Sequence, residues 1–406
     1  MKRTGLPLWV FLPGLFLLFL FVFPAGAETF EQNAPELGSQ AAVVLDAATG
    51  TLIFYKNPDE EIPPASLTKL MTMHLAFREI SEGRASLDEI IIPSRESWAA
   101  NQLPRSSVMN LANGQRLSLR ELLLGMAIFS GNDAATAVAL RFAPSVEEFA
   151  MMMTREAVAL GLFRTRFVDS SGYSEENMTT AREFADFCRI YLELHPESLS
   201  EYHAVREFAY PLPENWPDRT DPGTRVQRNT NSLLTKVVGV DGLKTGFIPE
   251  SGYNIALTAE RSGTRFIAVI LGAPSEWRGD RIRDADGEKL LEWAFANYRT
   301  VRPPVDTIEP VRVWKGKDDY AEVIPALPLD FTTFAERGEE LNWQIYYQDR
   351  LIAPIPQGSP VGDLILYDSL GELRRIPLIT AQGTEKGGFF KRLFDSIRLF
   401  FRKSGK

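Results

Sequence analysis

The chain has little cysteine and little histidine. Cys188 is the single cysteine in 406 residues, so no internal disulfide can form. The three histidines, His74, His195 and His203, have no spacing that matches a metal-ligand motif. These shortages exclude a disulfide framework and argue against a zinc site. We therefore expect neither a metal ion nor another cofactor.

The chain also lacks an excess of positive charge. Lys and Arg number 44 against 53 Asp and Glu, which gives a formal net charge of −9. A nucleic-acid binder needs cationic surface to neutralise phosphates, so we expect no nucleic-acid partner. The hydrophobic share of 45% is instead typical of a folded chain with a sizeable core, and the length predicts two domains.

Long apolar runs are missing except near the N-terminus. Residues 6–23 are apolar, follow a basic start and precede a small-x-small sequence at 25–27. This pattern predicts a secretory signal peptide over residues 1–27. An uncleaved membrane anchor is the alternative, and Pro13 and Pro24, which interrupt or end the run, argue against it. Both interpretations predict export.

Positive charge is concentrated at the other end of the chain. Residues 386–406 hold seven Lys or Arg and one Asp, or +6, which leaves −17 on residues 28–385. A helix over this tail would be ~20 Å long at ~1.5 Å per residue, shorter than a ~30 Å hydrocarbon core. We expect residues 385–406 to form an amphipathic helix on an anionic membrane surface; docking on the protein's own core is the alternative. Its apolar stripe comprises Phe389, Phe390, Leu393, Phe394, Ile397, Phe400 and Phe401.

Strand and helix patterns between the ends predict an α+β fold. Residues 41–45 with 51–55, and 254–259 with 265–271, flank short turns and predict two β-hairpins. Because strands at both ends enclose the helices, we expect a domain around one sheet over residues 28–300. Helical spacing begins after Pro63-Pro64 and recurs over residues 119–129, 133–142, 146–160, 180–194 and 280–298.

Composition changes after residue 300. The Arg-Pro-Pro sequence within residues 300–306 predicts a linker. Beyond it, residues 311–315, 342–348 and 364–367 are short alternating runs bounded by Pro, Gly and Asp. These runs predict a small all-β domain over residues 301–384.

Three short motifs, each present once, carry the candidate chemistry: Ser66-Leu67-Thr68-Lys69, Ser130-Gly131-Asn132 and Lys244-Thr245-Gly246. On a helix, side chains three residues apart share a face, so Ser66 and Lys69 are predicted neighbours. A helix start also offers free N–H groups and the positive end of the dipole to a developing oxyanion.

A serine hydroxyl needs a neighbouring base to become a nucleophile. The chain has no plausible Ser-His-Asp arrangement and no Gly-x-Ser-x-Gly sequence, so the candidate base for Ser66 is neutral Lys69. Burial and the second cation, Lys244, would lower the pKa of Lys69 enough for this role.

In this order, the motifs resemble those of low-molecular-mass penicillin-binding proteins that are D-alanyl-D-alanine carboxypeptidases. The resemblance rests on residues 64–69, 130–134 and 241–246 and extends to the β-rich second domain and the C-terminal tail. It implies a penicillin-binding, serine β-lactamase-like transpeptidase domain, with helices on both sides of an antiparallel sheet. It further implies a peptidoglycan stem pentapeptide as substrate, β-lactam antibiotics as inhibitors, and peripheral attachment at the periplasmic face of the cytoplasmic membrane.

The resemblance also implies catalytic roles. Ser66 is the acylated nucleophile and Lys69 is its base. The hydroxyl of Ser130 relays a proton to the leaving group.

For substrate binding, the resemblance implies that Asn132 holds the substrate amide. Lys244 and Thr245, in the motif completed by Gly246, bind the terminal carboxylate. The backbone N–H groups of Ser66 and Phe247 form the oxyanion hole.

Two positions depart from relatives of this kind. Phe247 stands where several carry histidine, and Thr230 stands where some carry arginine, so no role is assigned to Thr230. We place residues 169–173, which resemble a loop near the family's cleft, outside the catalytic set.

Other activities remain as alternatives. A serine β-lactamase of class A needs a Glu-x-x-x-Asn element, and none lies between Asn132 and Lys244. A non-enzymatic peptidoglycan-binding module would not need intact Ser66, Lys69 and Lys244, so their presence argues against it. Water, an amine or a crosslinked peptide as acceptor would give carboxypeptidase, transpeptidase or endopeptidase activity, and the three motifs do not distinguish them.

Overall fold

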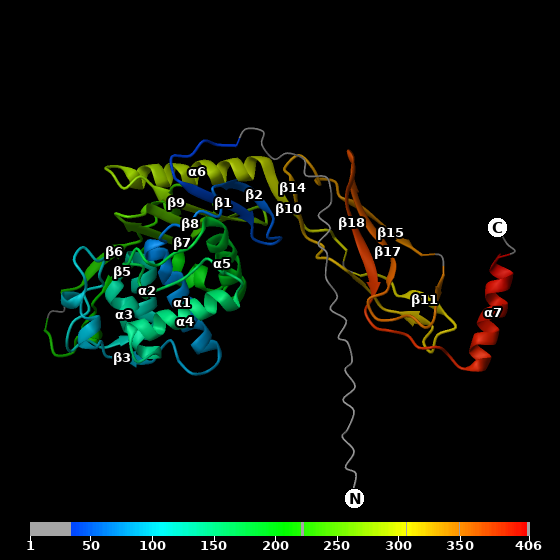
Figure 1. Cartoon of the computed structure of the whole chain (residues 1–406), viewed down its shortest axis with the longest axis horizontal. Helices are drawn as coiled ribbons and strands as arrows, with labels where there is room; N and C mark the ends of the chain where they lie inside the picture. The colour runs from blue at the N-terminus through cyan, green and yellow to red at the C-terminus, as the bar shows by residue number, and fades with distance from the viewer. Residues whose placement is uncertain (1–33, 221–222, 306, 349, 404–406) are drawn as a thin grey trace, which may run out of the picture. The chain divides into compact units, whose positions relative to one another are not determined.

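The computed structural model of the protein describes residues 34–220, 223–305, 307–348 and 350–403 (Figure 1). The signal peptide expected over residues 1–27 lies outside the described residues and stays a prediction.

The first domain is built on a five-stranded antiparallel sheet of order β2-β1-β9-β8-β7. β1 and β9 pair although more than 200 residues separate them, so the first and last thirds of the domain close the sheet together. Both predicted hairpins are present. The strands are β1 (Ala41–Asp46), β2 (Leu52–Lys56), β7 (Val240–Ile248), β8 (Gly252–Arg261) and β9 (Thr264–Ala273).

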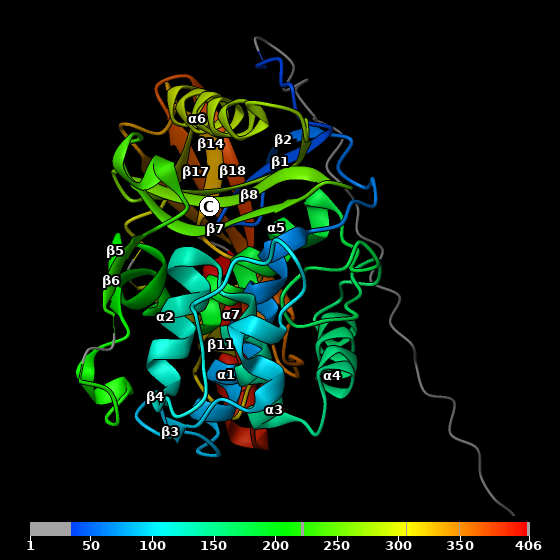
Figure 2. The same cartoon turned by 90° about the vertical axis from the view of Figure 1, so that its left-hand side faces the viewer.

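Helices cover both faces of this sheet, as Figures 1 and 2 show. The helix α6 (Gly279–Asn297) packs on β8 and β9 from one side, and α5 (Ala181–Leu194) packs on β1 and β9 from the other. Within β1, Val44 faces the α6 side whereas Val43 faces the α5 side. A strand buried on both faces is apolar along most of its length, which explains the unbroken run of apolar residues from Ala41 to Leu45.

The remaining helices of the domain lie on the α5 side of the sheet (Figure 2). They are α1 (Lys69–Ser81), α2 (Leu119–Phe129), α3 (Asn132–Phe142) and α4 (Val146–Ala159). Two short ribbons, β3 (Ile90–Ile91) with β4 (Leu117–Ser118) and β5 (Glu207–Tyr210) with β6 (Arg225–Arg228), complete the strands of this domain. Short helical turns occupy Ala65–Thr68 (η1), Arg95–Ser97 (η2), Ala99–Asn101 (η3), Leu199–His203 (η4), Pro213–Asn215 (η5) and Ser232–Thr235 (η6).

In its described residues the second domain contains strands and no helix, as expected for an all-β domain, and it has its own apolar core. Its first strand, β10 (Tyr298–Val301), follows α6 directly and pairs with β14 (Phe331–Phe334). The linker predicted from residue 300 is therefore wrong at its start, because Thr300 lies in a strand. A three-stranded sheet has the order β12-β11-β16 and a four-stranded sheet the order β13-β18-β17-β15. These strands are β11 (Val311–Trp314), β12 (Tyr320–Ala321), β13 (Val323–Pro325), β15 (Asn342–Tyr347), β16 (Leu351–Ile352), β17 (Pro360–Asp368) and β18 (Gly371–Thr380).

The last described element is the helix α7 (Phe389–Lys403), at the expected place. Its polar side contacts the second domain: buried Asp395 accepts a hydrogen bond from the backbone N–H of Lys315 at 2.7 Å, and Lys391 pairs with Asp319. The apolar stripe is exposed instead, with Phe390 at 73%. Among the described residues, no helix has both the length and the apolar character needed to span a bilayer.

Candidate active site

Ser66 lies in the turn η1, immediately before α1. The preceding Ala65 has a φ of 50°, in the left-handed region that residues with a side chain rarely adopt. Such conformations persist only where surrounding contacts enforce them, and they occur often at functional sites. The turn presents the Ser66 hydroxyl to Lys69, whose Nζ lies 2.9 Å from Oγ.

Lys69 is completely buried and is surrounded by hydrogen-bond acceptors. Its Nζ donates to Ser66 Oγ at 2.9 Å, to Asn132 Oδ1 at 2.7 Å and to the Ser171 carbonyl at 2.7 Å. Burial lowers the pKa of Lys69 to about 7, although Asp169 and Asp133 act in the opposite direction. Near neutral pH, a large share of Lys69 is therefore the neutral amine, which can accept a proton from Ser66.

Ser130 and Asn132 occupy the junction of two helices. The helix α2 ends at Phe129, Ser130 has a left-handed φ of 67°, and Asn132 begins α3. The Ser130 hydroxyl is buried and has no hydrogen-bond partner in the described part of the chain. Leaving a buried polar group unpaired costs about 1–3 kcal/mol, so this hydroxyl is available to a bound molecule.

The third motif lies within β7, at the edge of the sheet nearest η1. A side chain at Gly246 would place its Cβ 2.9 Å from the Pro64 carbonyl oxygen and 3.0 Å from Ser66 N. Only glycine lets the strand approach Ser66 this closely. Phe247 is the next residue of the strand, and its exposed ring lies tilted against Tyr253, with 4.3 Å between the ring centres.

Lys244 is a second buried cation at the site. Its Nζ donates to the Thr245 carbonyl at 3.0 Å. Burial lowers the pKa of Lys244 well below its usual value, and repulsion by Lys69 and Arg283 adds to the effect. The repulsion expected between the two motif lysines therefore contributes to the lowered pKa of Lys244. The lowered pKa of Lys69 is instead caused by burial.

The loop at residues 169–173, which the sequence analysis places outside the catalytic set, contacts Lys69. Its Ser171 carbonyl accepts a hydrogen bond from Lys69. The Asp169 carboxylate organises the loop by accepting hydrogen bonds from the backbone N–H groups of Ser171, Gly172 and Ser174. Burial alone would raise the pKa of Asp169, but these bonds lower it overall, so the group is ionised near Lys69.

A contact between Thr230 and the third motif was also not predicted. The hydroxyl of Thr230 lies 2.7 Å from the hydroxyl of Thr245. Thr230 precedes η6 and reaches the motif only through the fold, so its position along the chain contains no signal of this pairing.

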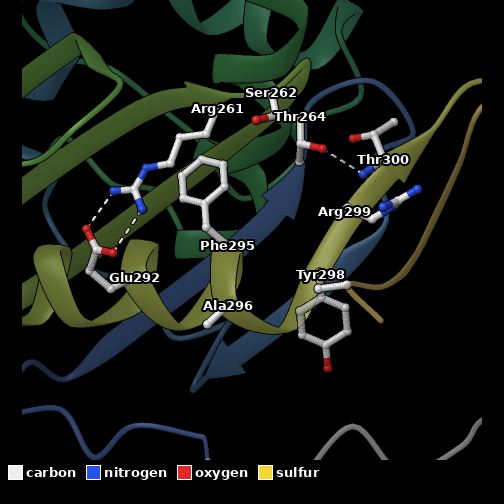
Figure 3. Close-up of a pocket in the computed structure, with 10 residues that line it drawn as sticks. Arg261, Ser262, Thr264, Glu292, Phe295, Ala296, Tyr298, Arg299 and Thr300 are labelled. Atoms are coloured by element: carbon white, nitrogen blue, oxygen red, sulfur yellow. Dashed lines mark hydrogen bonds and ion pairs between the residues drawn. The ribbon is translucent and has the colours of Figure 1, made fainter. Parts of the chain in front are cut away.

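A hollow at the β8–β9 turn is separate from these motifs (Figure 3). It has a volume of about 580 Å³, and Arg261 at its wall pairs with Glu292 at 2.5 Å. The guanidinium also lies 4.4 Å from the centre of the Phe295 ring. None of the residues that line this hollow belongs to the three motifs.

Comparison with known families agrees with the fold and the motifs. A family described as D-alanyl-D-alanine carboxypeptidase, peptidase family S11, matches residues 28–275. The chain belongs to this family. A second family, described as the C-terminal domain of penicillin-binding protein 5, matches residues 299–386. The chain is thus a serine-type peptidase of the penicillin-binding protein group, as the sequence predicts, and the predicted fold class is confirmed.

Individual relatives span nearly the whole chain. The carboxypeptidase DacC of Escherichia coli is 33% identical over 396 residues, which are 95% of this chain and 94% of the relative. The crystal structure of penicillin-binding protein 5 from Haemophilus influenzae superposes with a TM-score of 0.74 at 25% identity, covering 87% of this chain and all of that one. Penicillin-binding protein D2 from Listeria monocytogenes, solved with cefotaxime bound, has a TM-score of 0.55 at 29% identity and covers 64% of this chain and 98% of that one.

We predict that Asp169→Asn moves the pH profile of penicillin acylation to lower pH. The Asp169 charge raises the pKa of Lys69, so its loss lowers that pKa and keeps the neutral amine present at lower pH. The measurement is the second-order acylation rate between pH 5 and pH 9. Asp286→Asn is the matched control, because Asp286 also accepts a backbone hydrogen bond, from Ser39, but lies on α6. An unchanged midpoint in Asp169→Asn, or equal shifts in both variants, would contradict the prediction.

Proposed function

We propose that this enzyme removes the terminal D-alanine from peptidoglycan stem pentapeptides through an acyl-enzyme on Ser66. The observation that carries the proposal is the contact of 2.9 Å between Ser66 Oγ and a buried lysine whose pKa is about 7. This contact supplies a nucleophile and a base without histidine.

In the first step, Lys69 accepts the Ser66 proton while Oγ attacks the carbonyl carbon of the penultimate D-alanine. Negative charge develops on the carbonyl oxygen. The N–H groups of Ser66 and Phe247 would bind this oxyanion, because the contact at Gly246 brings the two backbone segments together.

In the second step, the peptide bond breaks and the D-alanine nitrogen needs a proton. The unpaired Ser130 hydroxyl would donate its own proton and regain one from the Lys69 ammonium. Asn132 would hold the substrate amide, and Lys244 and Thr245 would bind the departing carboxylate. Water then hydrolyses the ester on Ser66 and restores the free enzyme.

A β-lactam would follow the same first step. Opening of its ring leaves the amine tethered, so the acyl group stays on Ser66 unless water is activated for its removal. The Listeria relative with cefotaxime bound supports this view. The missing Glu-x-x-x-Asn element argues against β-lactamase activity. We favour water as the acceptor because relatives that span almost the whole chain are named carboxypeptidases.

The exported enzyme would be held at the periplasmic face of the cytoplasmic membrane by α7. The helix exposes its apolar stripe while Asp395, its acidic residue, is buried against the second domain. The tail carries +6 and the body −17, so anionic lipid would attract only the tail. Each cation near such a surface contributes ~1 kcal/mol.

We predict that penicillin forms a long-lived covalent adduct that is lost in Ser66→Ala. Intact-mass spectrometry measures the mass of one added penicillin. Ser81→Ala is the matched control, since Ser81 is an exposed serine at the end of α1. Labelling that survives Ser66→Ala would show that the nucleophile is a different residue.

We predict that deleting residues 387–406 releases a soluble enzyme with full activity. The measurements are co-sedimentation with phosphatidylglycerol-containing vesicles and release of D-alanine, on protein without residues 1–27. Phe400→Ser with Phe401→Ser keeps the tail charge and should also abolish sedimentation, because the apolar stripe is lost. A truncated protein that still sediments, or that unfolds, would show that α7 is not the attachment site.

A further inference from the structure

Three aromatic side chains follow one another across the strand ends beside the site. Phe247 on β7 is 42% exposed, and its ring centre lies 4.3 Å from that of Tyr253 on β8. Tyr253 is in turn paired with Ala273, the last residue of β9. The segment between β9 and α6 carries Trp277, which is 84% exposed. We call Phe247, Tyr253 and Trp277 the aromatic row.

The segment that carries Trp277 is packed against Tyr253. Gly279, two residues further on, lies so close that a side chain there would place its Cβ 2.7 Å from Tyr253 Cδ2 and would overlap the Pro274 carbonyl oxygen. Arg278 has a left-handed φ of 74°, a conformation that persists only where surrounding contacts enforce it. The backbone around Trp277 is therefore fixed at this end of the sheet, from which α6 runs to β10 (Figure 1).

The charges around Trp277 cancel. Glu276 and Asp280 stand against Arg278 and Arg281, so this surface has no net attraction for an anionic membrane. The Arg278 guanidinium lies over the Trp277 ring, 4.0 Å from its centre. At 84% exposure, the rest of the ring is open to a neutral ligand that can pack on an aromatic surface.

A sugar ring has these properties. The C–H groups on one face of the ring carry slight positive charge and pack on the negative face of an aromatic ring. The hydroxyl and N-acetyl oxygens can accept hydrogen bonds from the Arg278 guanidinium, which has five N–H donors. The substrate of the proposed function contains such sugars, because the first residue of the stem peptide is attached to an N-acetylated sugar of the glycan strand.

The length of the stem peptide fits the position of Trp277. In the proposed function the departing D-alanine lies at Lys244, so the rest of the peptide leaves Ser66 on the Phe247 side. Four residues separate the scissile bond from the sugar, and when extended they span ~13–14 Å. Trp277 follows β9, which lies two strands away from β7, or about 10 Å. A peptide that crosses the strand ends along Phe247 and Tyr253 therefore places its sugar at Trp277.

We propose that Trp277 binds a sugar of the glycan strand, with Phe247 and Tyr253 along the path of the stem peptide between Ser66 and that sugar. The aromatic row then makes the enzyme prefer stem peptides that are still attached to glycan. This inference rests on the proposed function and deepens it, because it names a part of peptidoglycan that is recognised beyond the stem peptide.

The test compares a free stem pentapeptide with the same pentapeptide attached to the disaccharide of N-acetylglucosamine and N-acetylmuramic acid. Trp277→Ala should lower kcat/KM for D-alanine release from the disaccharide pentapeptide about 5-fold or more. The loss should appear mainly in KM, because a contact remote from the reacting bond is the same in the ground state and the transition state. The value for the free pentapeptide should change less than about 2-fold. Trp277→Phe keeps an aromatic face and should stay within about 2-fold of the unaltered enzyme for both substrates.

Trp343→Ala is the matched control, because Trp343 is a tryptophan on β15 of the second domain and is 40% exposed. It should leave both values unchanged. Equal losses for the two substrates in Trp277→Ala, or no loss for either, would overturn the inference. If the unaltered enzyme releases no D-alanine from either substrate, the proposed function fails. The dissociation constants of the two compounds, measured by calorimetry with and without Trp277→Ala, then still decide the role of Trp277.

Discussion

The chemistry of the site depends on the burial of one lysine among three hydrogen-bond acceptors. Lys69 would be a fully charged and unreactive cation in water, whereas its burial lowers its pKa to about 7 and leaves it close to half-protonated at neutral pH. Ser66, Asn132 and Ser171 accept its hydrogen bonds and hold the amine in place. Each acceptor comes from a different segment of the chain. The base therefore exists only when η1, the α2–α3 junction and the loop at residues 169–173 are assembled.

The sheet keeps these segments in place. Its edge strand β7 carries Lys244 and touches η1 at Gly246, so the sheet sets the distance between Ser66 and the third motif. The left-handed conformations of Ala65 and Ser130 are strained, and the contacts of the assembled domain must compensate for that strain. The first domain can thus be understood as a rigid frame for a site whose own turns are unfavourable.

Residue spacing was enough to predict those parts of the site that are local. Ser66 and Lys69 are three residues apart on helical turns, and Ser130 and Asn132 meet at a helix junction, so their proximity follows from chain geometry. Ser171 contributes a backbone carbonyl. Because every residue type has one, no side-chain pattern predicts this contact. Thr230 meets Thr245 through a long-range contact of a common residue type. Such contacts depend on tertiary structure and were therefore hard to predict. The fold class was easier to predict, because it depends on hydrophobic periodicity along whole segments.

The most direct test of this account is a titration of Lys69 by NMR, in the enzyme without residues 1–27 and with lysines labelled at Nζ and Cε. The Lys69 resonance is assigned by its disappearance in Lys69→Arg. The account predicts a titration midpoint at a pH of about 7. A midpoint near the usual lysine value of 10.5 would contradict it, because Lys69 would then be charged at neutral pH and would not serve as the base for Ser66.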